Sequence, residues 1–194
     1  MLAAVILSGG ESSRMGSPKA LLRYQGGTFL EHLLAVTMHP KIGVRRVVLG
    51  AHAGPIMEAI PLAADEIVIN HEWQKGTLSS LHAALRSLPV GTEGSLLCLV
   101  DHPLVSAELV HHLIETFYSS KQKIVLPICD GRRGHPVIFR AELYQELLEA
   151  PLNIGARAVV WAHGQDIAEV QTEDQGCLLN INDPGALARL SENA

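Results

Sequence analysis

The sequence predicts an α/β protein: one three-layer, doubly wound, mostly parallel sheet in a single domain over residues 1–194. Three observations support this prediction. The chain has 194 residues, which is enough for one three-layer core and short for two. Its composition is 47% hydrophobic and 18% charged, so the chain should bury a core rather than remain disordered. Short apolar runs also alternate with stretches in which apolar residues recur at helical spacing.

The apolar runs are rich in leucine and β-branched residues, as expected of strands that are buried on both faces. They lie at residues 3–7, 46–49, 66–69, 95–100 and 123–128. Between these runs, apolar residues recur at helical spacing in the segments 28–38, 55–60, 78–88 and 107–118. This repeated strand, helix, strand order predicts a parallel sheet with helices on both faces.

The pattern changes after residue 128. A turn at 130–134 precedes a short apolar run at 137–139, which predicts a small antiparallel insertion. Helices are then expected at 141–149 and 154–163, and strands at 167–170 and 178–181. Asp183-Pro184 should open a final helix, because proline suits the first helical position.

Charge and cysteine content limit the partners. The formal net charge is −5 and no run of Lys or Arg forms a basic stripe, so we expect neither nucleic acid nor a membrane surface as a partner. The first apolar stretch, residues 2–7, is too short for a membrane span or a signal peptide. Cys98, Cys129 and Cys177 form no CxxC pair, which fits a reducing cytoplasm.

A glycine-rich loop at residues 7–19 follows the first predicted strand directly, where ligands of open α/β sheets bind. Its glycines permit close backbone approach, so that consecutive N–H groups can face phosphate oxygens. Arg14 and Lys19 can add charge-assisted hydrogen bonds to the same polyphosphate. A solvated surface loop is the alternative. The spacing matches neither a dinucleotide fingerprint nor a Walker loop.

Polar residues also follow two later strands. Asn70 ends one strand and residues 76–80 open a helix, which could surround a base or ribose or merely cap the helix. Asp101 follows the apolar run 96–100, and the free energy cost of burying a carboxylate there must be offset by a partner of opposite charge. Mg²⁺ would provide this charge, since this ion combines few carboxylates with waters and phosphate oxygens. The alternative is that Asp101 caps the helix near Ser106 or pairs with a buried arginine.

Residues 7–19 resemble the signature LxGGxSxRMGxxK of the MobA-like nucleotidyltransferases, which attach GMP or CMP to molybdopterin. Four further blocks, at 70–80, 100–103, 134–136 and 180–184, resemble later family blocks in the same order. The resemblance therefore covers most of the chain. It implies a Rossmann-like nucleotidyltransferase fold and transfer of a nucleoside monophosphate from CTP or GTP to molybdopterin, with release of pyrophosphate.

The resemblance also implies roles for individual residues. Arg14, Lys19 and Asp101 would be catalytic, and Asp101 would hold Mg²⁺. The second metal ligand would be Asn180 or Asn182, which are amides where many relatives have a carboxylate. The turn itself suggests that His135 and Arg132, with Arg133 close by, bind a phosphate of the acceptor; the alternative is that these arginines are only solvated. A molybdoenzyme would receive the product. The implied nucleotide contacts are Leu7, Ser8, Gly9, Gly10, Lys19, Asn70, Gly76, Ser80 and Asp101.

Two other functions fit parts of this pattern: transfer to a sugar or polyol phosphate, and nucleotide binding by a cofactor maturation factor without catalysis. The sequence also leaves open whether the base of the nucleotide is guanine or cytosine. Gly9-Gly10 resembles the guanylyl enzymes, whereas Pro18-Lys19 and the block 134–136 resemble the cytidylyl enzymes. We expect both nucleotides to bind, with a slight preference for CTP. The ten histidines show no HxxxH or HExxH spacing, which argues against zinc.

Overall fold

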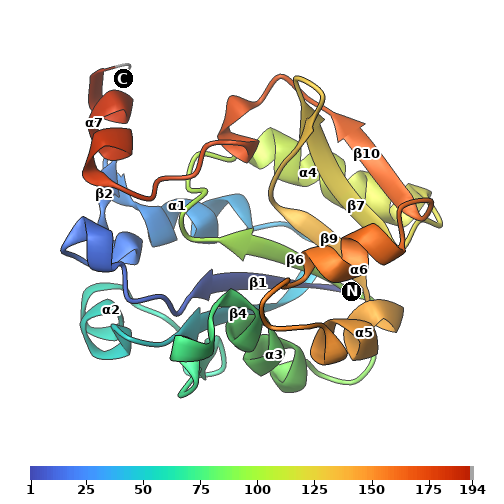
Figure 1. Ribbon diagram of the computed structural model, residues 1–194, viewed down its shortest axis with the longest axis horizontal. Coiled ribbons are helices and arrows are strands. Elements are labelled where there is room, and N and C mark those ends of the chain that lie inside the picture. Colours follow the sequence, from blue (N-terminus) through green and yellow to red (C-terminus); the bar gives the residue numbers. More distant parts are fainter. Residues whose placement is uncertain (193–194) are drawn as a thin grey trace.

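The fold has three layers, in which helices cover both faces of a central, mainly parallel sheet (Figure 1). The computed structural model describes residues 1–192. The sheet order is β10-β7-β9-β6-β1-β4-β5, with β8 beside β7. Its strands are β1 Leu2–Ser8, β4 Ile42–Leu49, β5 Ile67–Ile69, β6 Gly94–Leu99, β7 Ile124–Cys129, β8 Arg132–Arg133, β9 Val137–Arg140 and β10 Ile167–Gln171.

The predicted parallel sheet and antiparallel insertion are both confirmed. β1 pairs in parallel with β4 on one side and with β6 on the other. β5 and β10 also pair in parallel, with β4 and β7 respectively. β9 is antiparallel to both β6 and β7, and β8 is antiparallel to β7. Because the chain leaves β1 for β4 on one side and reaches β6 on the other, the carboxyl end of β1 is a topological switch point.

The helices begin where local sequence favours a start. Thr28 and Glu31 form a capping box before α1, and the Ser106 hydroxyl accepts from Leu109 N before α4. The last helix begins at Pro184, as predicted. The helices are α1 Phe29–Val36, α2 Ala53–Ala59, α3 Thr77–Ser87, α4 Ala107–Ser119, α5 Tyr144–Glu149, α6 Arg157–Ala162 and α7 Pro184–Glu192.

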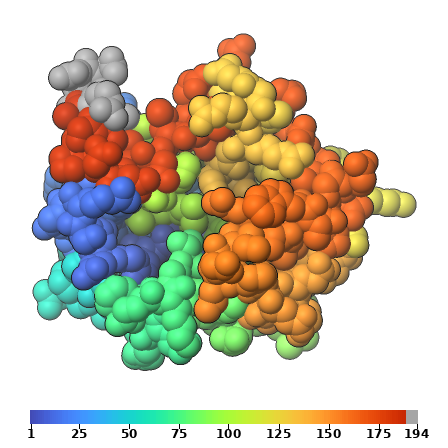
Figure 2. All heavy atoms as spheres, in the orientation of Figure 1, coloured from blue at the N-terminus to red at the C-terminus, as the bar shows by residue number. Residues whose placement is uncertain are grey.

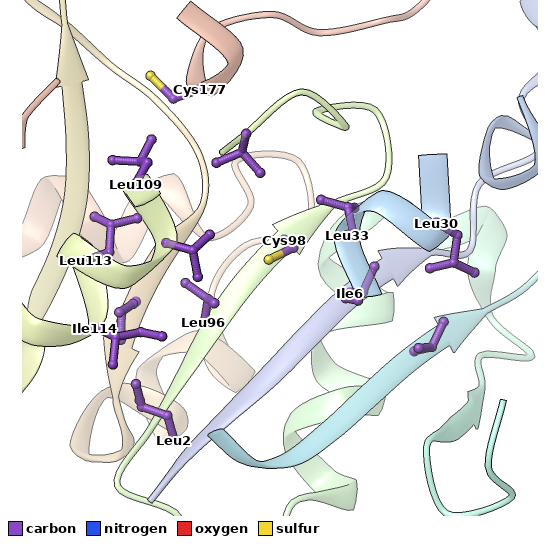
Figure 3. Close-up of a cluster of buried hydrophobic side chains, with 14 of the residues drawn as sticks. Leu2, Ile6, Leu30, Leu33, Leu96, Cys98, Leu109, Leu113, Ile114 and Cys177 are labelled. Atoms are coloured by element: carbon purple, nitrogen blue, oxygen red, sulfur yellow. The ribbon is translucent and has the colours of Figure 1, made fainter. Parts of the chain in front are cut away.

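Two buried clusters lie on opposite faces of the sheet, because alternate residues of each strand point to opposite sides. Leu2 and Ile6 of β1 pack with α1 and α4, in the cluster shown in Figure 3. Val5 and Leu7 of the same strand pack with α3 and α5 in the second cluster. This two-sided burial explains why β1 is a continuous apolar run.

Two features differ from the sequence prediction. The strand predicted at 178–181 is wrong: this segment follows a 3-10 helix, Gln175–Cys177, and has irregular backbone. Ile181 N donates to Asp101 O at 2.8 Å, and the apolar side chain is buried there without entering the sheet. A short apolar run reports burial but not strand pairing. The small hairpin of β2 (Arg23–Tyr24) and β3 (Gly27–Thr28) was not predicted.

The described helices are too short or too polar for any one of them to cross a bilayer.

Candidate active site

A cavity of about 260 Å³ opens at the carboxyl ends of β1 and β6. Figure 2 shows this face hollowed between the N-terminal segment in blue, the green segment before α3 and the orange and red C-terminal part. Most residues predicted for the site come together here. Those that line the cavity are Leu7, Ser8, Gly9, Gly10, Arg14, Lys19, Gly76, Ser80, Asp101 and Asn182.

Two glycines allow the loop after β1 to lie against its neighbours. A Cβ on Gly50, directly after β4, would lie 2.3 Å from the Gly9 carbonyl oxygen. A Cβ on Gly9 would lie 2.7 Å from Ser80 Oγ. Ala51 N donates to Gly9 O at 3.2 Å, which fixes the loop at this close approach. The loop is therefore held between β4 and the start of α3.

Lys19, Asp101 and Asn182 form a polar cluster on one side of the cavity. Lys19 Nζ donates to Asn182 Oδ1 at 2.6 Å and lies 3.6 Å from Asp101 Oδ2. The Lys19 and Asp101 side chains are 13% and 25% exposed, so both charges are partly withdrawn from water. Ser106 caps α4, so the alternative capping role for Asp101 is wrong. The cluster joins the loops after β1 and β6 to the segment before α7.

Asn70 supports the cavity wall from behind. Its buried amide donates to Ser79 Oγ at 2.9 Å and to Ser80 Oγ at 3.0 Å, and its oxygen accepts from Glu72 N at 2.9 Å. Asn70 does not line the cavity, whereas Ser80 does. In this structure the Asn70 amide orients Ser80, and the predicted contact between Asn70 and the nucleotide stays a prediction.

The donor set around Asp101 fits a magnesium ion that also uses phosphate oxygens. Asp101 offers a carboxylate at the cavity, and the Asn182 amide oxygen accepts from the same Lys19 Nζ that lies 3.6 Å from this carboxylate. A site with one carboxylate and one amide leaves positions for waters and phosphate, which is how Mg²⁺ is usually held. Asn180, the other predicted second ligand, is exposed and lies outside the cavity lining.

A separate group of side chains of the kinds that bind metal ions lies near α4. Donor atoms of His39, His111 and Glu115 lie within 4.8 Å of one another. Lys41 N donates to His39 Nδ1 at 3.2 Å, so the neutral His39 ring carries its proton on Nε2, 3.1 Å from His111 Nδ1. Lys41 Nζ also donates to Glu115 Oε1 at 2.7 Å. In this structure these groups are therefore joined by hydrogen bonds.

A second cavity of about 590 Å³ adjoins the first, and the two share Leu7, Thr77 and Leu99. His135 lines the second cavity, as expected for the acceptor side. Burial, and to a smaller extent the neighbouring His102 ring, 4.9 Å away between centroids, lower the pKa of His135 to about 4. His135 is therefore neutral near pH 7.

The arginine beside His135 is not the one that the sequence favoured. Arg132 is exposed and lines neither cavity, whereas Arg133 lines the second and pairs with Glu169 at 2.7 Å. Consecutive residues of β8 point to opposite sides, which explains the difference.

The structure adds residues that sequence reasoning missed. Trp73 is half-buried and lines the first cavity. His52 lines the same cavity, and its ring contacts Glu11 O at 2.7 Å. Arg157 and Trp161 of α6 line the second cavity. The one signal for His52 was its position just after a strand, where ligands of α/β sheets bind.

Comparison with known proteins assigns the family. The family model of the MobA-like NTP transferase domain matches residues 4–167. The chain belongs to this family. A probable molybdenum cofactor guanylyltransferase of Mycobacterium marinum is 30% identical over 190 residues, which cover 93% of this chain and 89% of that protein. The chain is thus a nucleotidyltransferase, and the glycine-rich loop at residues 7–19 lines the cavity at the ends of β1 and β6.

Solved structures agree on the fold. The crystal structure of Rv0371c from Mycobacterium tuberculosis H37Rv has a TM-score of 0.83 and 25% identity, with 98% of this chain and 97% of that chain covered. A second structure of Rv0371C, a complex with manganese, has a TM-score of 0.78 and 22% identity over 100% of this chain and 99% of that one. The Rossmann-like nucleotidyltransferase fold expected from the sequence is confirmed.

Proposed function

We propose that this nucleotidyltransferase moves GMP from GTP to molybdopterin and releases pyrophosphate. The observation that carries the proposal is the meeting of Lys19, Asp101 and Asn182 beside the glycine-rich loop, in a cavity that adjoins a second one. Relatives named as molybdenum cofactor guanylyltransferases support both the acceptor and the base.

The mechanism needs charge neutralisation and alignment but no covalent intermediate with the protein. An acceptor phosphate oxygen forms a bond to the α-phosphorus of GTP, while the bond from that phosphorus to the bridging β-phosphate oxygen breaks. Arg14 and Lys19 line the cavity and supply positive charge to the phosphate oxygens. The backbone N–H groups of the loop can donate to the same oxygens.

Mg²⁺ is the proposed cofactor, held by Asp101 with Asn182 as the nearest second ligand. Held there, the ion would supply positive charge that offsets the negative charge of the phosphate groups. Lys19 orients the Asn182 amide through the 2.6 Å hydrogen bond and keeps a positive charge beside the Asp101 carboxylate. The manganese complex of Rv0371C supports a divalent cation.

CTP is the second candidate nucleotide, because Pro18-Lys19 and the block 134–136 resemble the cytidylyl enzymes. The guanylyltransferase relatives favour GTP over the slight CTP preference expected from the sequence. Gly9 lets the loop lie close to Ser80, because a Cβ there would be 2.7 Å from Ser80 Oγ, and both residues line the first cavity. We further propose a cytoplasmic location, which the three buried free thiols support, and a molybdoenzyme as the recipient of the product.

Pyrophosphate release, measured with each of the four NTPs with and without molybdopterin, tests the proposal. We expect release only with molybdopterin, fastest with GTP, and dependent on Mg²⁺. Release that requires a sugar or polyol phosphate would contradict the acceptor. GTP binding without any release would instead indicate a nucleotide-binding factor that does not catalyse transfer.

A further inference from the structure

We propose that Arg157 and Trp161 form a binding face for the ring system of a planar, fused-ring heteroaromatic acceptor that carries an anionic group. This inference rests on the proposed function and adds to it the place and the chemistry of acceptor binding. The two side chains belong to α6, shown in orange in Figure 1.

Trp161 is the first observation. It is 66% exposed, although an indole is among the largest apolar surfaces that a protein can bury. The exposed ring forms part of the wall of the second cavity. A flat aromatic ring at a cavity wall favours a flat aromatic ligand, because offset stacking adds dispersion and quadrupole attraction to burial.

Arg157 supplies the charge. It lies four residues before Trp161, so both side chains project from one face of the helix, and both line the cavity. Within residues 1–192, the Arg157 guanidinium has no ion pair and no side-chain hydrogen bond, whereas Arg133 in the same cavity pairs with Glu169. Arg157 is therefore the available guanidinium of this cavity for a ligand anion.

The rest of the cavity suits a ligand of this size and kind. Its volume of about 590 Å³ falls within the range of roughly 300–1,000 Å³ that is usual for small-molecule sites. Leucine, isoleucine and valine side chains form much of the lining, including Leu126, Val137 and Ile154. His135 also lines this cavity, and its buried Nδ1 has no hydrogen-bond partner among the described residues.

The shared wall explains how a ligand here would meet the nucleotide. The two cavities share Leu7, next to the last residue of β1, Leu99, the last residue of β6, and Thr77, the first residue of α3. Asp101 and Lys19 line the first of these adjoining cavities. A ligand that places its rings on Trp161 can thus extend an anionic group toward the nucleotide.

The chain contains two tryptophans, one at each cavity, which makes fluorescence a selective test. The Trp73→Phe variant reports Trp161, and the Trp161→Phe variant reports Trp73. The probe is pterin-6-carboxylate, a fused heteroaromatic with one carboxylate. N-acetyltryptophanamide corrects for absorption and collisional quenching, and GTP with Mg²⁺ serves as the ligand of the first cavity.

We expect pterin-6-carboxylate to quench Trp161 saturably, and GTP to change Trp73 emission. Arg157→Ala, made in the Trp73→Phe background, should weaken the pterin affinity about tenfold, because a charge-assisted hydrogen bond is lost. Arg86→Ala is the matched control: this exposed arginine of α3 lines neither cavity, so pterin affinity should not change.

Quenching of Trp161 that matches N-acetyltryptophanamide, or an equal effect of Arg157→Ala and Arg86→Ala, would overturn the inference. These outcomes are separate from failure of the proposed function, which GTP-dependent pyrophosphate release measures. In addition, Trp161→Ala should raise the acceptor KM about tenfold and leave the GTP KM unchanged. An unchanged acceptor KM with active transfer would remove Trp161 from the site while the function stands.

Discussion

Gly9→Ala tests how the cavity selects a base. Gly9 is buried and follows β1, and an added Cβ would lie 2.7 Å from Ser80 Oγ. That separation is well inside the contact distance of about 3.5 Å, so Ser80 must move. Its hydroxyl can turn to another staggered rotamer, which breaks the 3.0 Å hydrogen bond from Asn70 Nδ2.

The magnitude follows from this single hydrogen bond. A typical intramolecular hydrogen bond contributes about 1 kcal/mol to the free energy of unfolding, or about a factor of five in an equilibrium constant. Asn70 keeps its bond to Ser79 Oγ at 2.9 Å, so the fold should survive with a melting temperature about 3 °C lower. The methyl group also narrows the cavity beside Ser80. We therefore expect the preference to shift about fivefold from GTP toward CTP.

Competition binding with the four NTPs measures this shift in wild type, Gly9→Ala and Gly10→Ala. Gly10 lines the same cavity, yet a Cβ there would meet no atom of the described residues within 4 Å. Gly10→Ala should therefore leave the GTP to CTP ratio unchanged. Equal ratios in all three proteins, or equal shifts in both variants, would refute the role of Ser80 in base choice. A large fixed preference for ATP or UTP would do the same.

Three further substitutions test the polar groups. Lys19→Met should lower pyrophosphate release about 100-fold in a protein that still melts cooperatively, and unchanged turnover would remove Lys19 from the site. Asp101→Asn should reduce turnover about 100-fold while nucleotide affinity changes far less; normal turnover at low Mg²⁺ would contradict the metal assignment. Hydrogen bonds to Glu146 and Asp166 raise the pKa of His163. The protonated His163 ring therefore stabilises the folded protein below the ordinary histidine pKa, and this stabilisation disappears as the pH rises through the raised pKa. His163→Gln should therefore cost up to about 1 kcal/mol of unfolding free energy near pH 5.5 and almost none near pH 8.5, and equal urea midpoint shifts at both would contradict this.

Local patterns were sufficient for the architecture and for the loop. The run at 3–7 is apolar at every position, which indicates burial on both faces, and the glycines follow it at once. Asp101 stood out for the same reason, as a carboxylate at the end of a buried strand. Parallel strands bring their carboxyl ends to one edge, so these two segments had to meet there.

Contacts between distant segments were beyond the reach of the sequence. Lys19 and Asn182 are 163 positions apart, and their hydrogen bond depends on how the segment after the 3-10 helix lies over the β6 loop. The apolar run at 178–181 had the composition of a strand, yet it packs as irregular chain. Composition measures the tendency to be buried, but only tertiary packing selects the partner.

The sequence by itself determined the fold class, the family and most of the residues that line the first cavity, because these depend on periodicity and on residues close together in the chain. The tertiary structure alone decided that Asn70 supports Ser80, that Arg133 and not Arg132 faces the second cavity, and that Trp161 lines it. Each of these depends on the direction of one side chain. That direction is set by packing between elements that are far apart in sequence, so local patterns do not contain it.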